Sequence, residues 1–390
     1  MSDKNLVIIS HNYNDFVKDQ TETIAHNFSK ISVCVRYNTI MKYLSYLPVQ
    51  RFANFKTSRH LDVHNLPHNI SVYPTDVFYW PSDAQYRKLG DLHAKIVKKT
   101  IMEKNIPFDL IHSHFTWSAG YAGARLREEY GVPFVVTAHG EDIYDIPFRD
   151  EDWKMKIEYV LNTADHIITV SQSNLACIKK LKVKKPVTVM PNGFRGDLFF
   201  RRDTPECRRM LGLPGDKKII LAVGTLEHVK GHTYLISSMK EIISRRKDVL
   251  CIIVGAGELR TTLERQIHSL GLEGYVRLAG GKPHNEIPLW ISACDLFVLS
   301  SLNEGNPTVM FEALGCGKPF IGTRVGGVPE VIVSDVYGLL VNPADPADLA
   351  GKILSALDRT WDQEAIVQYA DRFTWNEISQ EIMKVYRSVL

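Results

Sequence analysis

The sequence has no long apolar run: none approaches the roughly 18 to 20 consecutive apolar residues that a membrane-spanning helix needs. Its opening residues, MSDKNLVIIS, also lack an apolar stretch of the length of a secretory signal. The 6 cysteines include no CxxC pair and no histidine at a zinc-binding spacing. The net charge of +3 over 390 residues is too small a bias to indicate a nucleic acid partner. We therefore expect a cytoplasmic protein that holds no zinc and binds no nucleic acid.

Short apolar runs alternate with stretches of helical periodicity along almost the whole chain. The runs are residues 6–10, 31–37, 70–73, 110–113, 134–137, 166–170, 187–190, 219–223, 250–254, 276–278, 296–299, 320–322 and 339–341. Runs that are apolar at successive positions are typical of parallel strands covered on both faces. The alternation predicts an α/β fold with doubly wound parallel sheets, in which ligands bind beyond the carboxyl ends of the strands.

The segment PNGFRGDLFFRR, residues 191–202, combines proline, two glycines and charges, and a new series of strands follows it. We place a domain boundary there, between residues 195 and 196. The end of the chain is helical and has one apolar face, formed by Trp375, Ile378, Ile382 and Val385 with Tyr386 beside them. Such a face has to pack against something. We therefore expect residues 369–390 to return to the N-terminal domain.

The most informative segment is CDLFVLSSLNEGNPTVMFEALGCGKPFIGT, residues 294–323. Asn306 followed by Pro307 is a strong helix start, because Asn is a favoured N-cap and Pro is favoured at the first helical position. The predicted helix runs from about Pro307 to Leu314, where a glycine-rich stretch ends it. Its N-terminus lies at the carboxyl edge of the predicted sheet, and free N–H groups there favour an anion.

Two glutamates, Glu304 and Glu312, bracket this helix start, and Gly305 allows a ligand to approach the backbone closely. A carboxylate accepts hydrogen bonds from the hydroxyls of a sugar or ribose. One loop therefore offers donors to a phosphate and acceptors to hydroxyls, a combination that indicates a nucleotide-sugar. Glutamates near a helix start also simply complement the helix dipole, so this loop alone leaves both interpretations open.

The string SSLNEGNPTVMFEALGCGKPFIGTRVGGVPE, residues 300–330, resembles the donor-site signature of the retaining GT-B glycosyltransferases of family GT4, the glycosyl transferases group 1. Further matches follow in the order of the family: TAHGED at 137–142, PNG at 191–193, VGTLEHVKG at 223–231, IIVGAGE at 252–258 and LAGG at 278–281. The resemblance covers most of the chain from about Asp109 onward. It implies the GT-B fold, with two Rossmann-like domains facing a central cleft. Residues 1–195 would bind the acceptor and residues 196–368 the nucleotide-sugar.

The resemblance also implies roles for single residues. Glu304 would contact the hydroxyls of the donor sugar, Glu312 the ribose and Lys230 the diphosphate, while His139 would face the sugar from the first domain. The turn Gly305–Thr308 would offer N–H groups to sugar and phosphate, and the nucleobase would lie near Gly280–Lys282. The expected catalytic residues are His139, Glu304 and Lys230. The expected donor-binding residues are Gly224, Thr225, Lys230, Gly255, Gly280, Gly281, Glu304, Gly305, Asn306, Pro307, Thr308 and Glu312.

No DxD motif follows a strand at a plausible donor site, and the acids at 150–152 and 345–348 are typical of turns and helix starts. We therefore expect no metal ion and no cofactor, with the helix N-terminus and Lys230 stabilising the leaving nucleotide diphosphate. The resemblance implies a retaining hexosyltransferase. It would move a hexose-type sugar from a UDP- or GDP-linked donor to a hydroxyl of a glycan or lipid-linked acceptor, in the synthesis of a cell-surface polysaccharide or glycolipid.

Two features depart from the family pattern. Thr225 stands where an arginine that also binds the diphosphate is usual. The absence of this arginine implies weaker donor binding, a replacement by His228, Arg195 or Arg324, or a degenerate enzyme. SHNYNDFVKDQ, residues 10–20, stands in place of the glycine-rich turn after the first strand, so the acceptor side is atypical. Thr225 keeps open a catalytically silent partner subunit that binds nucleotide-sugar or glycan, and a sugar-nucleotide epimerase is a further alternative on the same fold.

Acidic residues are missing between Glu22 and Asp62, where lysines and arginines are interleaved with tyrosines and phenylalanines. Basic and aromatic side chains together suit the headgroup region of an anionic membrane. The pattern favours peripheral contact with such a membrane through residues 30–60, and an ordinary solvated loop explains it equally well. His112 and His114, at the end of another expected strand, are interpreted as lining or packing residues.

Overall fold

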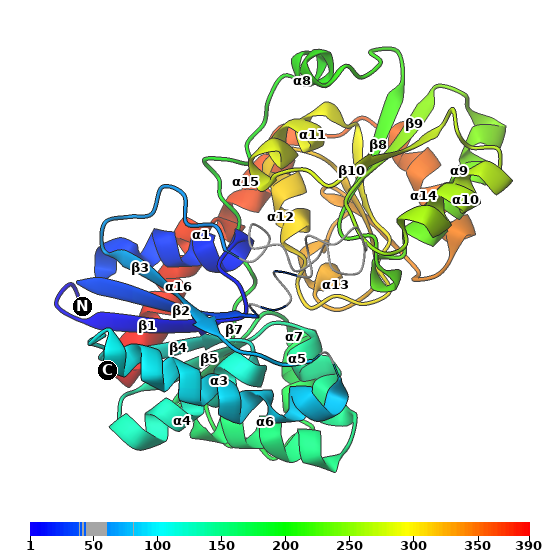
Figure 1. Cartoon of the computed structure of the whole chain (residues 1–390). Helices are drawn as coiled ribbons and strands as arrows, with labels where there is room; N and C mark the ends of the chain where they lie inside the picture. The colour runs from blue at the N-terminus through cyan, green and yellow to red at the C-terminus, as the bar shows by residue number, and fades with distance from the viewer. Residues whose placement is uncertain (39, 41–42, 44–60, 81) are drawn as a thin grey trace. The chain divides into compact units, whose positions relative to one another are not determined.

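In the computed structural model, which describes residues 1–38, 40, 43, 61–80 and 82–390, the chain forms two compact units (Figure 1). Unit 1 contains Met1–Asn192 together with Trp375–Leu390, and unit 2 contains Gly193–Thr374. The chain therefore changes unit after residues 192 and 374, whereas the sequence placed the boundaries after 195 and 368. The second difference has a simple cause: helix α15 (Gln363–Ala370) packs on α12 (Thr308–Gly315) in the core of unit 2, so the return begins only after it.

Unit 1 contains a 7-stranded parallel sheet with the order β3-β2-β1-β4-β5-β6-β7. Its strands are β1 Asn5–Ser10, β2 Lys30–Tyr37, β3 Ile70–Asp76, β4 Leu110–His114, β5 Phe134–Ala138, β6 His166–Thr169 and β7 Val187–Val189. The order reverses between β1 and β4. This reversal is the switch point at which doubly wound sheets bind ligands.

Helices cover both faces of this sheet. In the described part of unit 1, the helices and short helical turns are α1 Asp15–Ile24, η1 Ala25–Asn27, α3 Asp83–Glu103, η4 Thr116–Gly120, α4 Tyr121–Tyr130, α5 Glu141–Tyr144, η5 Ile146–Phe148, α6 Glu151–Thr163, α7 Gln172–Ile178 and α16 Trp375–Val389. Apolar residues of α3, α4 and α6 form the core on one face, and those of α1 and α16 form the core on the other.

The last helix, α16, confirms the expected return of the chain end. Figure 1 shows α16, in red, beside α1, in blue. The whole expected stripe lies in the core of this face: Trp375, Ile378, Ile382, Val385 and Tyr386 are buried. Tyr386 is fully buried, and its hydroxyl is 2.6 Å from Nδ1 of His112 on β4, so the last helix is joined to the central strands.

Unit 2 repeats the same topology in a 6-stranded parallel sheet of order β10-β9-β8-β11-β12-β13, with its switch point between β8 and β11. Its strands are β8 Lys218–Val223, β9 Val249–Val254, β10 Val276–Gly280, β11 Leu296–Leu299, β12 Phe320–Thr323 and β13 Gly338–Val341. Every run that the sequence marked as a strand overlaps one in the two sheets, so the predicted α/β fold is confirmed.

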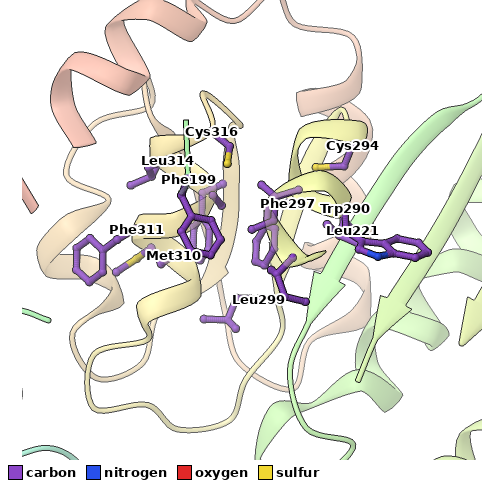
Figure 2. Close-up of a cluster of buried hydrophobic side chains, with 14 of the residues drawn as sticks. Phe199, Leu221, Trp290, Cys294, Phe297, Leu299, Met310, Phe311, Leu314 and Cys316 are labelled. Carbon is purple, nitrogen blue, oxygen red and sulfur yellow. The ribbon is translucent and has the colours of Figure 1, made fainter. Parts of the chain in front are cut away.

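Helices cover both faces of the second sheet as well. They are α8 Thr204–Leu211, η6 His228–Lys230, α9 His232–Arg245, α10 Arg260–Ser269, η7 His284–Glu286, α11 Ile287–Ala293, α12 Thr308–Gly315, α13 Val328–Val331, α14 Pro346–Leu357, α15 Gln363–Ala370 and η8 Asp371–Phe373. Figure 2 shows the core on the side of α11 and α12. Met310 and Phe311 of α12 belong to the same cluster as Phe199, and Phe297 of β11 lies between the two helices. This packing holds α12 rigidly against the sheet.

The cysteines are reduced thiols, and most of them are buried. All 6 are free, and those other than Cys177 are buried. Burial raises the pKa of Cys34, Cys251 and Cys294 to about 12, so these thiols stay protonated and pack as small apolar groups.

Candidate active site

The expected donor-binding residues gather at the carboxyl edge of the sheet in unit 2. Gly224 and Thr225 directly follow β8, Gly255 follows β9, and Gly280 ends β10. The segment from Glu304 to Thr308 joins β11 to α12. Because β8 and β11 flank the switch point, this is the position at which a doubly wound sheet binds a ligand.

Three of these glycines form a row across the ends of neighbouring strands. The N–H of Gly224 donates to the carbonyl of Val254 at 3.0 Å, and the N–H of Gly255 donates to the carbonyl of Gly280 at 3.0 Å. A Cβ atom at Gly255 would lie 1.8 Å from the carbonyl oxygen of Gly224, so no other residue fits there without moving the backbone. The row leaves a strip of backbone, bare of side chains, beside the switch point.

Lys230 and Glu304 form an ion pair beside this strip. Nζ of Lys230 lies 2.7 Å from Oε1 of Glu304, and the hydroxyl of Ser301 donates to the same oxygen at 2.7 Å. The Glu304 side chain is 9% exposed and that of Lys230 is 26% exposed. Gly231 fixes the lysine turn, since it has a φ of 62° and a Cβ there would lie 2.0 Å from the carbonyl oxygen of Ser300. Both described bonds use Oε1, which leaves Oε2 for the hydroxyls of a ligand.

The N-terminus of α12 differs from the prediction by one residue. The helix begins at Thr308, and Pro307 occupies the N-cap position with an extended backbone (φ −71°, ψ 117°), whereas Asn306 was the expected cap. A proline has no polar side chain, and no side chain of the described residues caps this helix. The N–H of Met310 donates to the carbonyl of Pro307 at 3.2 Å, whereas no described residue accepts from the N–H groups of Thr308 and Val309. These two N–H groups can serve an anion.

A second loop supports the Glu304 turn. It contains Gly326 and Gly327 of the GGVPE motif, and the N–H of Gly327 donates to the carbonyl of Gly305 at 2.9 Å. Gly326 has a φ of 50°, and a Cβ there would lie 1.7 Å from the carbonyl oxygen of Glu304. The motif was part of the recognised signature, yet its role as a support of the Glu304 backbone emerges only from the structure.

Glu312 lies one turn into α12 and is 7% exposed. Its Oε1 is 4.0 Å from Nε2 of His284, which belongs to the 3₁₀ turn just after Gly280–Lys282. The expected ribose and nucleobase residues thus lie at one end of the site. Sequence reasoning missed His284, because a single histidine in a polar loop carries no distinguishing pattern.

In unit 1, His139 follows β5 directly and pairs with a second histidine. Its Nε2 is 3.0 Å from Nδ1 of His114, and burial lowers the pKa of both rings, that of His114 to about 3. Two neutral rings joined in this way leave one N–H and one lone pair at the outer nitrogens. Among the described residues, neither Nε2 of His114 nor Nδ1 of His139 has a hydrogen-bond partner. The carboxylate of Asp142 fixes the backbone by accepting from the N–H groups of His139 and Gly140 at 3.1 and 2.7 Å.

His112 has a different role from this pair. Both of its ring nitrogens are engaged, Nδ1 by the hydroxyl of Tyr386 at 2.6 Å and Nε2 by the hydroxyl of Thr137 at 2.7 Å. It is fully buried and joins β4, β5 and α16. This is the packing role expected for His112, whereas the contact of His114 with His139 was not foreseen.

Comparison with known proteins identifies the family. A family model described as "Glycosyl transferases group 1" matches residues 203–373, and one described as "Glycosyltransferase Family 4" matches residues 58–195. The D-inositol 3-phosphate glycosyltransferase of Corynebacterium jeikeium is 30% identical over 311 residues, which span 74% of this chain and 74% of that protein. The chain belongs to the group 1 glycosyltransferases.

Two further proteins extend the comparison. The putative teichuronic acid biosynthesis glycosyltransferase TuaC of Bacillus subtilis is 28% identical over 341 residues, which span 85% of this chain and 80% of that protein. The crystal structure of Anabaena HepE in complex with UDP is similar in fold, with a TM-score of 0.75 and 22% identity, and the match covers 99% of this chain and 100% of that one. The expected GT-B fold is thus confirmed, and the protein is a glycosyltransferase enzyme.

Thr225, where this glycosyltransferase departs from the family pattern, has room for a larger side chain. The Thr225 side chain is exposed, while its backbone carbonyl accepts from Nε2 of His232 at 3.1 Å. Burial lowers the pKa of His232 to about 4, so it holds this loop as a neutral ring. Arg195, one expected replacement, is engaged by Asp197 at 2.6 Å, whereas His228 lies on the same 3₁₀ turn as Lys230.

The acidic clusters have the structural roles that the sequence predicted. Asp150 and Asp152 lie 2.5 and 3.0 Å from the guanidinium of Arg87, and Asp345 caps α14. Within residues 1–38, 40, 43, 61–80 and 82–390, no three His, Cys, Asp or Glu side chains are grouped so that they could hold a metal ion.

The membrane prediction concerns residues 30–60, of which 39, 41–42 and 44–60 lie outside the described residues. No helix in the described part of this glycosyltransferase is long and apolar enough to cross a membrane. Peripheral contact stays a prediction.

Proposed function

We propose that the protein transfers a hexose-type sugar, with retention of configuration, from a UDP- or GDP-linked donor to a hydroxyl of a glycan or lipid-linked acceptor. The reaction would proceed without a metal ion and would serve the synthesis of a cell-surface polysaccharide or glycolipid. The observation that carries the proposal is the grouping of Lys230, Glu304 and the uncapped N-terminus of α12 at the switch point of unit 2.

The donor would bind along this edge of the sheet. The diphosphate would accept from the first-turn N–H groups of α12 and from Lys230, since both place positive charge where the leaving group becomes negative. Oε2 of Glu304 would accept from hydroxyls of the sugar, and Glu312 from the ribose. The bare glycine strip would let the nucleotide lie directly on the backbone.

Charge in the site supports departure of the nucleotide diphosphate. Because Lys230 is held by a carboxylate only 2.7 Å away, its ammonium group is positioned before the donor arrives. As the anomeric bond breaks, negative charge grows on the phosphate and the attraction to this fixed cation grows with it. The departing phosphate would take the proton of the acceptor hydroxyl on the same face of the sugar. The catalytic role expected for His139 of unit 1 stays a prediction.

Two comparisons support the choice of donor and pathway. The HepE crystal structure, similar in fold, contains UDP, which makes UDP the first nucleotide to test. The name of the Bacillus subtilis relative refers to teichuronic acid biosynthesis, which supports a role in making a surface polysaccharide.

The test is UDP and GDP binding by calorimetry with the full chain, in wild type and Lys230→Ala. Loss of a charge-assisted hydrogen bond costs about 1.5–3 kcal/mol, so the affinity for the correct nucleotide should fall about ten- to one-hundred-fold. Lys240→Ala, at an exposed position on α9 of the same unit, is the control and should bind normally. Unchanged affinity in Lys230→Ala, with an intact circular dichroism spectrum, would contradict the site assignment.

Thr225 in place of an arginine favours one second candidate, a catalytically silent subunit that binds the nucleotide-sugar. Release of free UDP or GDP from the bound sugar-nucleotide distinguishes an active glycosyltransferase from a silent subunit. Turnover that depends on both Glu304 and Lys230 supports catalysis, whereas tight binding without release supports the silent subunit.

A further inference from the structure

A second polar site lies in unit 1, at the carboxyl edge of its sheet. The pairing of β2 with β3 places Arg36 beside Thr75, and His11 and Phe115 follow directly after β1 and β4. The ring of His11 stacks on that of Phe115, with centroids 4.7 Å apart. Arg36, Thr75, His11 and Phe115 therefore form a row across the switch point between β1 and β4. This position in unit 1 corresponds to the candidate donor site in unit 2.

The hydrogen bonds around Arg36 fix the direction of each proton. The hydroxyl of Thr75 donates to the carbonyl of Val35 at 2.9 Å, so at 3.5 Å it accepts from Nε2–H of His93. Burial lowers the pKa of His93 to about 3, so the ring is neutral and its Nδ1 accepts from the hydroxyl of Ser118 at 3.0 Å. The oxygen of Ser118 is then an acceptor for Nη1 of Arg36 at 3.1 Å. This series of hydrogen bonds holds the guanidinium in place through Nη1, and no described residue accepts from its other N–H groups.

His11 adds a neutral donor to the same row. Its Nε2 accepts from the backbone N–H of Ser118 at 3.1 Å, and burial lowers the pKa of the ring well below its usual range. In a neutral ring whose Nε2 is an acceptor, Nδ1 carries the proton. No described residue accepts from that Nδ1–H. Ser118 thus orients both Arg36 and His11.

The charge of Arg36 is unmatched. Its side chain is partly buried, and no carboxylate oxygen of the described residues lies within 4.0 Å of it. The undescribed residues 39, 41–42, 44–60 and 81 contain no Asp or Glu at all. The face of Tyr79 lies 5.5 Å from the guanidinium, a contact that attracts a cation without neutralising it. By contrast, Arg127 in the same unit pairs with Asp165 at 2.8 Å.

We propose that Arg36 and His11 bind an anionic group of the acceptor, either a phosphate monoester or a sugar carboxylate. A guanidinium presents N–H groups in a planar fork that matches both anions, and the neutral histidine adds a donor beside it. Partial burial makes such a contact strong, because the anion replaces water around a cation that pairs with no carboxylate of the described residues. The inference rests on the proposed function, since it assigns the acceptor side of that reaction to unit 1.

The experiment measures sugar binding by calorimetry to the full chain saturated with UDP, so that the donor site is occupied. The probes are glucose 6-phosphate, glucuronic acid and glucose. Wild type should bind at least one of the two anionic sugars and should bind glucose at least tenfold more weakly. The preferred anionic sugar identifies the source of the negative charge.

Arg36→Gln should lose at least tenfold in affinity for the anionic sugar, and Arg36→Lys should keep part of it, because the charge remains while the fork is lost. Arg125→Gln, on the exposed side of α4, is the matched control and should bind as wild type does. If Arg36→Gln fails to fold, the comparison of Arg36→Lys with Arg125→Gln carries the test.

Three results would overturn the inference: glucose binding as tightly as the charged sugars, no binding of either charged sugar, or no effect at Arg36. Weaker UDP binding in Arg36→Gln would also overturn it, because Arg36 would then serve the donor. Failure of the proposed function looks different: UDP would not bind, or Lys230→Ala would bind it as wild type does.

Discussion

At the scale of the residue, Thr225 is the most informative single position. Its side chain is exposed and its backbone is held by His232, so a larger side chain can be introduced without moving the loop. We predict that Thr225→Arg binds UDP about tenfold more tightly, since a charged hydrogen bond at a partly exposed site contributes roughly 1.5 kcal/mol. Calorimetry measures the gain, and Thr262→Arg on α10, also exposed, controls for added charge alone. Equal affinity in both variants would show that this position does not face the diphosphate.

The sequence could predict the types of residue in the site but not their contacts. Lys230 and Glu304 were expected to serve different parts of the donor, yet in the structure they bind each other at 2.7 Å. Ser301 and His284 were missed because a serine in a loop and a histidine after a strand have no spacing that marks them. Contacts of this kind arise between segments that are far apart in the sequence, so no local pattern reports them.

At the scale of the element, the loop with Gly326 decides the position of the Glu304 turn. A Cβ at Gly326 would lie 1.7 Å from the Glu304 carbonyl, and the φ of 50° disfavours any side chain. We predict that Gly326→Ala weakens UDP binding at least tenfold while the protein stays folded. Gly351→Ala is the matched control, because a Cβ there meets nothing within 4 Å. Gly351 lies within α14, where alanine should add about 0.5–1 kcal/mol to the free energy of unfolding. Normal UDP binding by Gly326→Ala would mean that the loop moves without displacing Glu304.

The strands and most helices were predictable for a physical reason. A strand buried on both faces must be apolar at successive positions, and such a run is visible without any knowledge of its neighbours. Helix ends are less certain: α12 begins at Thr308 because the extended backbone of Pro307 stops the helix there, although Asn306 is the better capping side chain. The end of unit 2 was placed a few residues too early: the predicted boundary after residue 368 falls inside α15, whereas unit 2 continues to Thr374.

At the scale of the whole molecule, the two units differ in how many buried histidines they hold. In the described part of unit 1, burial lowers the pKa values of six: His11, His93, His112, His114, His139 and His166. In the described part of unit 2 the corresponding residue is His232, with a pKa of about 4. A buried neutral histidine accepts a proton less readily than it does in the unfolded chain, where its pKa is about 6.5. Acid therefore favours the unfolded state, and it does so more strongly in unit 1.

The sign and the pH range of this effect follow from these shifts. The stability from each of these histidines is fully present above pH 6.5 and is lost as the pH falls toward the lower folded pKa. The loss approaches about 1.4 kcal/mol per pH unit for each group. Asp142 acts in the opposite direction, because burial raises its pKa, but it is one group against six histidines. Carboxylates with lowered pKa values, such as Asp150 at about 2, titrate below pH 5 in both states and do not contribute between pH 6.5 and 5.

We therefore predict that lowering the pH from 7 to 5.5 destabilises unit 1 by several kcal/mol, as an order of magnitude, and unit 2 by about one. Hydrogen exchange measured by mass spectrometry, corrected for the intrinsic rate at each pH, reports the two units separately. Peptides that cover β4 should lose protection, whereas peptides that cover β11 should keep most of it. His93→Gln should reduce the pH dependence in unit 1 by about one proton, and the same change at the exposed His268 should leave it unaltered. Equal loss of protection in both units would show that the buried histidines do not govern acid stability.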